Sequence, residues 1–384
     1  MLRPTSRDIA AGLAIGLVPP GPPRPAGGPA PDPLTALEAA VRPALRRSPC
    51  VLSFSGGLDS SLVLAVAVRV ARREGLSDPV PVTWRFTGAP GAEESTWQER
   101  VIRALGLPDW QILRADDDLD LVGPVARRSL RRHGVRHPAN VHLHLPVVEL
   151  AAGGAMLTGL GGDQILAGWR RPLRTRLRVR LGRLRRRALG QAYPPPPPPL
   201  TWLRPEVAAQ VRRATREWVR GEPHRLGDRM AYHARSRDRL LMLDALDAIG
   251  ADHDVRPVHP LFDEGFRDAL AAHHGHRRDP TRRSLLAAIG GDALPPEVTA
   301  PRGKALFGDV FLRLPTREFV RGWDGTGVDA DLVDRDRLRA VWAGERIPWR
   351  TALLVQHLWL RANPPGPAPV VPPARATDDR EVTT

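Results

Sequence analysis

The chain has 384 residues, enough for one large or two medium hydrophobic cores. Its formal net charge is +15, but the composition is rich in arginine overall, so the charge alone gives little support to nucleic-acid binding. The single cysteine, Cys50, excludes an internal disulfide and a cysteine metal cluster. No apolar run reaches membrane-spanning length and the first residues do not lead into a signal peptide, which predicts a cytoplasmic protein without membrane contact.

The first half of the chain alternates between short apolar runs and amphipathic segments. Residues 1–33 come before this pattern and are predicted to be an irregular lead-in, because Pro and Gly crowd residues 17–33. Between residues 34 and 170 the expected strands are 50–54, 80–86, 110–114 and 155–158. The expected helices are 34–47, 59–74, 92–105, 120–133 and 145–152. This alternation predicts an α/β fold, a parallel sheet with helices on both faces.

The sequence changes character after residue 170. Residues 171–200 are predicted to be a linker, because an arginine-dense stretch (170–187) is followed by six consecutive prolines. Those arginines form either a solvated surface or a docking surface for an acidic partner. Residues 201–362 have a mostly helical pattern, and residues 363–384 are predicted to be disordered. The expected helices are 205–220, 227–249, 263–274, 330–343 and 349–361.

The most informative segment is the loop after the first expected strand. It reads Ser-Phe-Ser-Gly-Gly-Leu-Asp-Ser-Ser over residues 53–61. A strand that leads through such a loop into a helix directs backbone N–H groups and the positive end of the helix dipole at one point, which suits a phosphate. A carboxylate beside phosphates indicates Mg²⁺ between them. The expected phosphate-binding residues are Ser55, Gly56, Gly57, Asp59, Ser60 and Ser61.

A second glycine-rich turn follows the strand expected at 155–158. It reads Thr-Gly-Leu-Gly-Gly-Asp-Gln over residues 158–164, and again places a carboxylate before a helix. Gly161 and Gly162 are therefore further candidates for phosphate binding. Two such loops on one sheet could hold one Mg²⁺–pyrophosphate between Asp59 and Asp163.

The first loop resembles the SGGxDS pyrophosphate loop of the ATP pyrophosphatase superfamily. The pair of loops is similar to the synthetase domain of asparagine synthetases and of β-lactam synthetase. Val258–Asp263 resembles the VPFLD-like stretch of that domain, and Arg302–Phe307 resembles its RxKxxF element. The resemblance runs from about residue 34 to 362. It implies an adenine nucleotide alpha hydrolase-like sheet, completed by the helical part at 201–362.

The resemblance also implies a reaction. A carboxylate attacks ATP to give an acyl-adenylate and pyrophosphate, and ammonia or an amine then displaces AMP to form an amide. Lys304 is expected to stabilise charge on the α-phosphate, with Arg302 in the same element, and Thr83 is expected to lie beside the adenosine. Lys304 is the only lysine among 57 basic residues, which favours a site that needs a compact ammonium group.

The sequence departs from the family pattern in three respects. It lacks the glutaminase domain with its N-terminal cysteine, so the nitrogen is expected from free ammonia, from an amine substrate or from a separate glutaminase. Leu160 stands where asparagine synthetases have Glu and β-lactam synthetase has Tyr, and Gln164 replaces a Glu. Leucine cannot accept a proton, so any general base must lie elsewhere. Both changes argue against aspartate as the acid and leave another small-molecule or peptide carboxylate.

Asn140, His142 and His144 alternate on a short expected strand ahead of the second loop. Together with Asp263 they are candidates for the substrate pocket. The histidines are equally consistent with solvated positions or with buried structural ones. A zinc site is not expected, because nothing else shows ligand spacing.

Two other functions fit parts of the sequence. A tRNA-modifying enzyme of the same superfamily would suit the positive charge, but its sulfur-transferring members generally need catalytic cysteines. A non-catalytic nucleotide-binding partner protein would suit Leu160 and Gln164, although Asp59, Asp163 and Lys304 are all retained.

Overall fold

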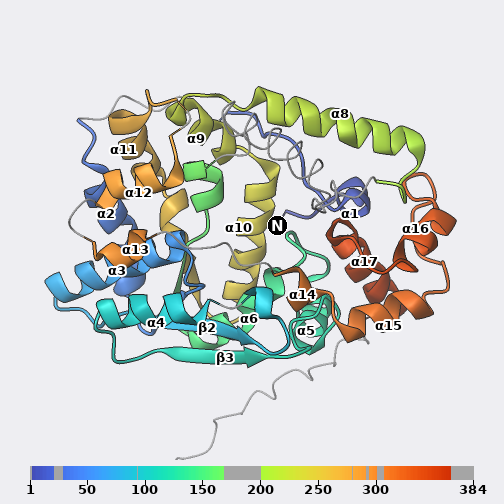
Figure 1. The fold of residues 1–384 in the computed structure, drawn as a ribbon, viewed down its shortest axis with the longest axis horizontal. Helices are drawn as coiled ribbons and strands as arrows, with labels where there is room; N and C mark the ends of the chain where they lie inside the picture. The colour runs from blue at the N-terminus through green and yellow to red at the C-terminus, as the bar shows by residue number, and fades with distance from the viewer. Residues whose placement is uncertain are drawn as a thin grey trace, which may run out of the picture.

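The computed structural model describes residues 2–20, 29–92, 94–167, 200–278, 280–290, 294–300 and 307–364 (Figure 1). A five-stranded parallel sheet forms its centre, in the order β3-β2-β1-β4-β5. The strands are β1 (Cys50–Ser53), β2 (Val80–Phe86), β3 (Gln111–Ala115), β4 (Ala155–Thr158) and β5 (Arg256–Val258). The predicted α/β class and the four predicted strands are confirmed, while β5 was not foreseen.

Helices surround the sheet and build the C-terminal part (Figure 1). The α-helices of the first half are α1 (Ser6–Ala11), α2 (Pro33–Leu45), α3 (Leu58–Arg73), α4 (Ser95–Ala104), α5 (Pro124–His133) and α6 (Leu145–Leu150). Those of the second half are α8 (Pro205–Gly221), α9 (Leu226–Ala234), α10 (Arg237–Ala251), α11 (Glu264–His274), α12 (Arg282–Gly290), α13 (Pro296–Thr299), α14 (Gly308–Phe311), α15 (Leu314–Gly322), α16 (Arg335–Trp342) and α17 (Ala352–Ala362). Short 3₁₀ turns are η1 (Pro90–Ala92), η2 (Val141–His144), η4 (Pro260–Phe262) and η6 (Trp349–Thr351), and η3 (Gly162–Ala167) is a π-helical turn.

The strand order explains why both faces of the sheet are covered. From β1 to β2 to β3 the chain moves in one direction, and from β3 to β4 it crosses back past β1. Because parallel crossovers are right-handed, reversing direction puts α3 and α4 on one face and α5 and α6 on the other. The reversal point lies between β1 and β4, where Ser53 pairs with Thr158 at the carboxyl ends of the strands. Ligands bind at such a switch point in open parallel sheets, and both predicted loops begin there.

Two apolar clusters form the interior. The first lies between the sheet and its helices, and includes the fully buried Leu52, Leu64 and Met156. The second joins the N-terminal segment to the C-terminal helices around Trp202 and Leu338. The predicted boundaries at residues 33, 170, 200 and 362 stay predictions, and the Arg-rich and proline-rich stretch falls outside the described residues.

The N-terminal segment is ordered where the sequence predicted an irregular lead-in. Ser6–Ala11 forms α1, which begins with a capping box between Thr5 and Asp8. The indole N–H of Trp202 donates to the Ala10 carbonyl at 2.8 Å. The prediction is wrong here because the helix is only 6 residues long and depends on distant contacts such as that of Trp202, which local pattern does not show.

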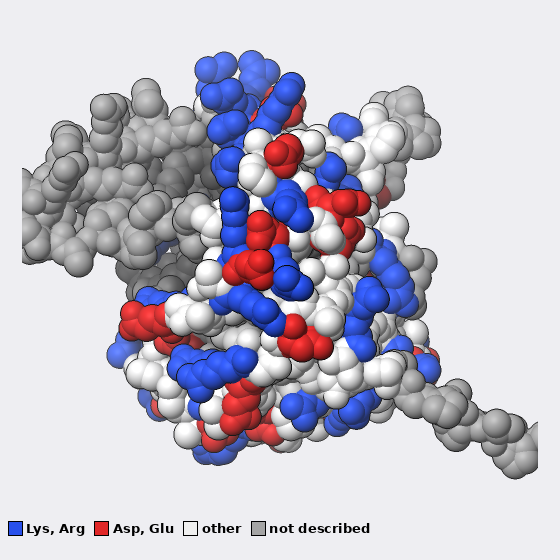
Figure 2. All heavy atoms as spheres, turned by 90° about the vertical axis from the view of Figure 1, so that its right-hand side faces the viewer, with Lys and Arg blue, Asp and Glu red and all other residues white. Residues whose placement is uncertain are grey.

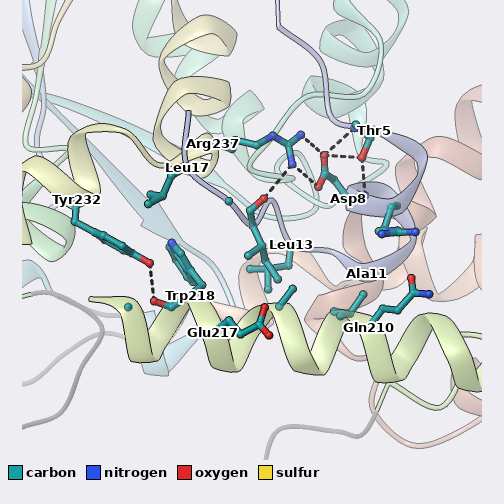
Figure 3. Close-up of a pocket in the computed structure, with 16 residues that line it drawn as sticks. Thr5, Asp8, Ala11, Leu13, Leu17, Gln210, Glu217, Trp218, Tyr232 and Arg237 are labelled. Carbon is teal, nitrogen blue, oxygen red and sulfur yellow. Dashed lines mark hydrogen bonds and ion pairs between the residues drawn. The ribbon is translucent and has the colours of Figure 1, made fainter. Parts of the chain in front are cut away.

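A cavity of about 800 Å³ lies between this segment, α8 and the start of α10 (Figure 3). Arg237 reaches into it and donates to both carboxylate oxygens of Asp8, at 2.6 and 3.1 Å. Burial raises the pKa of Asp8, but hydrogen bonds from Arg237 and Thr5 outweigh burial, so the pKa lies below its usual value. The ion pair therefore holds the N-terminal segment against α10.

Asp8→Asn is expected to lower the free energy of unfolding by about 2 kcal/mol at pH 7, because Arg237 loses a charged partner. The folded pKa is lowered, so this contribution is present above the ordinary Asp pKa of about 3.9 and is lost as the pH falls through the folded value. Urea unfolding at pH 7 and pH 3 measures it, with the exposed Asp336→Asn as control. A loss of equal size at both pH values would contradict the assignment.

The single helix predicted over residues 227–249 is wrong, since the structure has α9 and α10 with a break at Arg235 and Ser236. The Ser236 side chain accepts from Arg239 N and caps α10, while its backbone pairs with Leu17 in an antiparallel bridge. Apolar spacing continues across the break, so the pattern hides it.

The face that carries α15, α16 and α17 shows acidic and basic side chains interspersed rather than one basic patch (Figure 2).

Candidate active site

The first loop turns sharply between β1 and α3, and glycine makes the turn possible. Gly56 has a φ of 81°, in the left-handed region that other residues rarely adopt. A Cβ at this position would lie 2.7 Å from Cγ of Gln98 on α4. Gln98 also donates from Nε2 to the Ser55 carbonyl at 3.0 Å. Helix α4 therefore holds the loop from outside at a distance that only glycine permits.

Serine hydroxyls fix the loop from within. Ser55 Oγ accepts from the Gly57 N–H at 3.2 Å and lies 3.1 Å from Ser60 Oγ. Ser60 Oγ also lies 3.2 Å from the Gly57 carbonyl, to which it donates. Ser55, Gly57, Asp59 and Ser60 line a cavity, whereas Ser61 is fully buried and supports the loop from behind.

The structure brings the second loop into contact with the first. A Cβ on Gly159 would lie 2.5 Å from the Ser60 nitrogen, and a Cβ on Gly162 would lie 1.9 Å from Cγ of Asp59. Both positions thus require glycine for space. Gly161 adopts a φ of 110° between them. Neither Gly161 nor Gly162 lines the cavity; Gly162 lets the two loops meet, whereas Gly161 approaches Leu261 and Phe262 of η4.

Arg282, the first residue of α12, lies between the two predicted metal carboxylates. Its Nε donates to Asp59 Oδ1 at 2.8 Å, and its Nη1 donates to Asp163 Oδ1 at 2.9 Å. Its Nη2 forms a further ion pair with Asp59 Oδ2. Sequence reasoning placed the two carboxylates together but missed the arginine that joins them. No local signal could reveal it, because 223 residues separate Arg282 from Asp59.

A cavity of about 460 Å³ opens where β1, β2 and β4 end. Val82, Trp84 and Phe86 line it from alternate positions of β2, as the two-residue period of a strand requires. Phe307 packs edge-on against Phe86, with ring centroids 5.9 Å apart, and extends this aromatic wall. Thr83, predicted at the adenosine, does not line the cavity: its hydroxyl donates to the Phe54 carbonyl at 2.8 Å and accepts from Trp110 Nε1.

The four candidates for the substrate pocket divide evenly. Asn140 and His144 line the cavity. His142 does not, because its two ring nitrogens contact the carbonyls of Ala139 and Leu119. Asp263 caps α11 by accepting from Phe266 N at 2.9 Å. The expected strand is a 3₁₀ turn, η2, so Asn140, His142 and His144 do not share one face as they would on a strand.

Two partly buried histidines, His144 and His259, lie beside the second loop. Burial lowers the pKa of His144 to about 4. Burial, with the neighbouring His144 and Arg239, lowers the pKa of His259 to about 3. The Nδ1 atom of His259 shares a hydrogen bond of 2.7 Å with the hydroxyl of Thr158, which lines the cavity. Both imidazoles are therefore neutral at physiological pH and present uncharged hydrogen-bonding groups.

These histidines predict that the protein loses stability in mild acid. His142, whose pKa burial also lowers to about 4, joins His144 and His259. Below pH 6.5 these histidines become protonated in the unfolded chain but stay neutral in the folded protein. The free energy of unfolding therefore decreases as the pH is lowered, until the pH reaches the pKa values of the folded state. Between pH 6.5 and 5.5 the expected loss is roughly 1 kcal/mol for each histidine, measured by urea unfolding. His142→Gln should reduce this loss by roughly 1 kcal/mol, and an unfolding free energy constant over the window would contradict it.

Lys304 and Arg302, the predicted catalytic residues, lie outside the described residues. Phe307 follows Lys304 by three positions and lines the cavity.

The comparisons with known proteins agree with this geometry. The asparagine synthase family model matches residues 34–362. The chain belongs to the asparagine synthase family. A search of curated proteins finds no match to it. Members of the asparagine synthase family are carbon–nitrogen ligases that use ATP, and this chain is a synthetase of that kind. None of the described helices combines the length and apolar composition that a membrane crossing requires.

Proposed function

We propose that this synthetase is an AMP-forming amide ligase. The observation that supports it best is the contact between the two glycine-rich loops. This contact brings Asp59 and Asp163 to the same guanidinium, that of Arg282, beside the cavity. A substrate carboxylate attacks the α-phosphorus of ATP, forming an acyl-adenylate as pyrophosphate leaves. An amine then attacks the acyl carbon, the amide bond forms, and AMP leaves with the electron pair of the broken C–O bond.

The cavity divides into regions that suit the parts of ATP. The loop at Ser55–Ser60 opens α3, so its N–H groups and the helix dipole favour the pyrophosphate. The aromatic side chains of Trp84 and Phe86 provide a surface for the adenine. Lys304 would stabilise negative charge that develops on the α-phosphate, a task for a positioned point charge.

Asp59 and Asp163 would hold Mg²⁺. Their oxygens are the hard ligands that Mg²⁺ prefers, and they already converge on a cation, so the donor set fits. Mg²⁺ usually keeps several waters and is held by one or two carboxylates together with substrate phosphates, so phosphate oxygens and water would complete the coordination. Bound there, Mg²⁺ would neutralise charge on the leaving pyrophosphate.

The described lining favours an acid other than aspartate. Leu119, Leu143, Leu160 and Phe311 line the cavity near Asn140 and His144. The charged side chains among the described lining residues are Asp59, Glu94 and Arg282. Burying the ammonium and second carboxylate of aspartate against these leucines would cost desolvation energy that an apolar side chain does not. We infer an acid, small molecule or peptide, whose non-reacting part is largely apolar.

The proposed function also includes a nitrogen source and a cellular compartment. The nitrogen comes from ammonia or an amine, free or delivered by a separate glutaminase. The reaction takes place in the cytoplasm, where ATP is abundant.

Carboxylate-dependent exchange of labelled pyrophosphate into ATP tests this function. Purified protein with Mg²⁺ and ATP is supplied with acids ranging from aspartate to apolar and aromatic carboxylates. Exchange with an apolar acid, and not with aspartate, is the expected result. ATP binding without exchange for any acid, with or without amine, would instead favour the non-catalytic partner protein.

A further inference from the structure

Arg282 uses its guanidinium as a fork on the two carboxylates. Both oxygens of Asp59 are engaged, one by Nε and one by Nη2, and Asp163 Oδ1 is engaged by Nη1. The Asp59 side chain is 13% exposed and that of Arg282 25%, so the contact is partly shielded from water. Charge-assisted, two-pronged pairs of this kind are the strongest that side chains make.

The position of Arg282 is unfavourable for its own helix. It is the first residue of α12, where the helix dipole places partial positive charge. Arg283 follows it, so two cations open the helix, against the usual preference for Asp or Glu. Arg283 is exposed to solvent, whereas Arg282 turns toward the loops. A cation at an unfavourable helix position that contacts the loop carboxylates is expected to have a role in the site rather than in the helix.

A guanidinium and Mg²⁺ cannot share these oxygens. Mg²⁺ requires oxygens at about 2.0–2.1 Å in octahedral geometry, which brings its ligands close together. The arginine keeps the carboxylates apart by its own width, with N–O distances of 2.8 and 2.9 Å on its two sides. Two cations at the same place would also repel each other.

We propose that Arg282 is a resident cation that makes metal binding depend on polyphosphate. Without nucleotide it neutralises Asp59 and Asp163 and excludes the divalent ion. When a polyphosphate enters the loop, its oxygens offer the guanidinium an equivalent charged acceptor. Arg282 then leaves the carboxylates for the phosphate, and the carboxylates become available to a divalent ion that the phosphate shares. This inference rests on the proposed function for the identity of the anion, but not for the competition itself.

Binding of Mn²⁺, followed by the electron paramagnetic resonance signal of the free ion, tests the inference without any turnover. Wild type, Arg282→Gln and the matched control Arg283→Gln are compared with and without α,β-methylene ATP. Without nucleotide, Arg282→Gln should bind Mn²⁺ at least about tenfold more tightly than wild type, because two carboxylates lose their internal cation. Arg283→Gln should behave as wild type. With the ATP analogue, wild type should bind Mn²⁺ and the difference between variants should shrink.

The same titrations can overturn the inference. Equal Mn²⁺ affinity of wild type and Arg282→Gln without nucleotide would do so, and so would no binding to either protein at millimolar Mn²⁺. An equal gain in Mn²⁺ affinity in Arg283→Gln would also overturn it, because removing one positive charge anywhere nearby would then explain the effect. If Arg282→Gln fails to fold by circular dichroism, Arg282→Lys keeps the charge without the fork and should still show tighter binding than wild type. Because these comparisons need no acid substrate, they are independent of whether the exchange assay succeeds.

Discussion

Asp59→Asn is expected to abolish carboxylate-dependent ATP–pyrophosphate exchange, with a loss of at least about 10³-fold. Asp59 is the carboxylate at the start of α3 with both oxygens bound to a cation, and it faces the cavity. An amide of the same size keeps the shape but removes the charge that a divalent ion needs. Exchange rates at saturating ATP measure the loss.

The matched control for this change is Asp336→Asn, the same substitution at a carboxylate that is 77% exposed on α16. It should leave the exchange rate unchanged. Circular dichroism and binding of an ATP analogue separate a catalytic loss from misfolding. Exchange within tenfold of wild type in a folded Asp59→Asn protein would remove Asp59 from the mechanism.

Gly162→Ala is expected to lower the exchange rate by about 10²-fold. Its new Cβ would fall 1.9 to 2.1 Å from the carboxylate atoms of Asp59, far inside van der Waals contact. The Asp59 carboxylate or the second loop must therefore move by more than about 1 Å, and displacements of that size cost about this much in catalysis. The same assay measures the effect.

Gly322→Ala is the appropriate control for Gly162→Ala. Gly322 ends α15, and a Cβ there would meet nothing within 4 Å. It should leave both activity and folding unchanged. If Gly162→Ala retained the wild-type rate, the close contact of the two loops would have no part in holding Asp59.

The parts of the site that could be predicted are those encoded locally. The loop at residues 53–61 and the turn at 158–164 each combine a strand, glycines and a carboxylate in a few residues, and the structure brings them together. The four longer or strongly apolar strands also followed from periodicity. Strand β5 was not predicted, because its three residues, Arg256–Val258, are too few to show a period.

The parts that could not be predicted depend on distant contacts or on which face a residue takes. In β2 the alternation of Val82, Thr83 and Trp84 is evident, but Thr83 was expected to face the ligand, and the face with Val82 and Trp84 lines the cavity instead. The hydroxyl of Thr83 bonds a neighbouring backbone on the opposite face. Arg282 contacts Asp59 although 223 residues separate them, and nothing in its local sequence distinguishes it from Arg283.

The central claim is that a carboxylate is activated as an acyl-adenylate, and transfer of ¹⁸O tests it most directly. The acid that supports exchange is labelled in its carboxylate with ¹⁸O and incubated with the protein, Mg²⁺, ATP and an amine. Mass spectrometry of the nucleotide products should show AMP carrying one ¹⁸O atom, with unlabelled pyrophosphate. Formation of ADP with the label in inorganic phosphate would contradict the account, because the acid would then have attacked the γ-phosphorus.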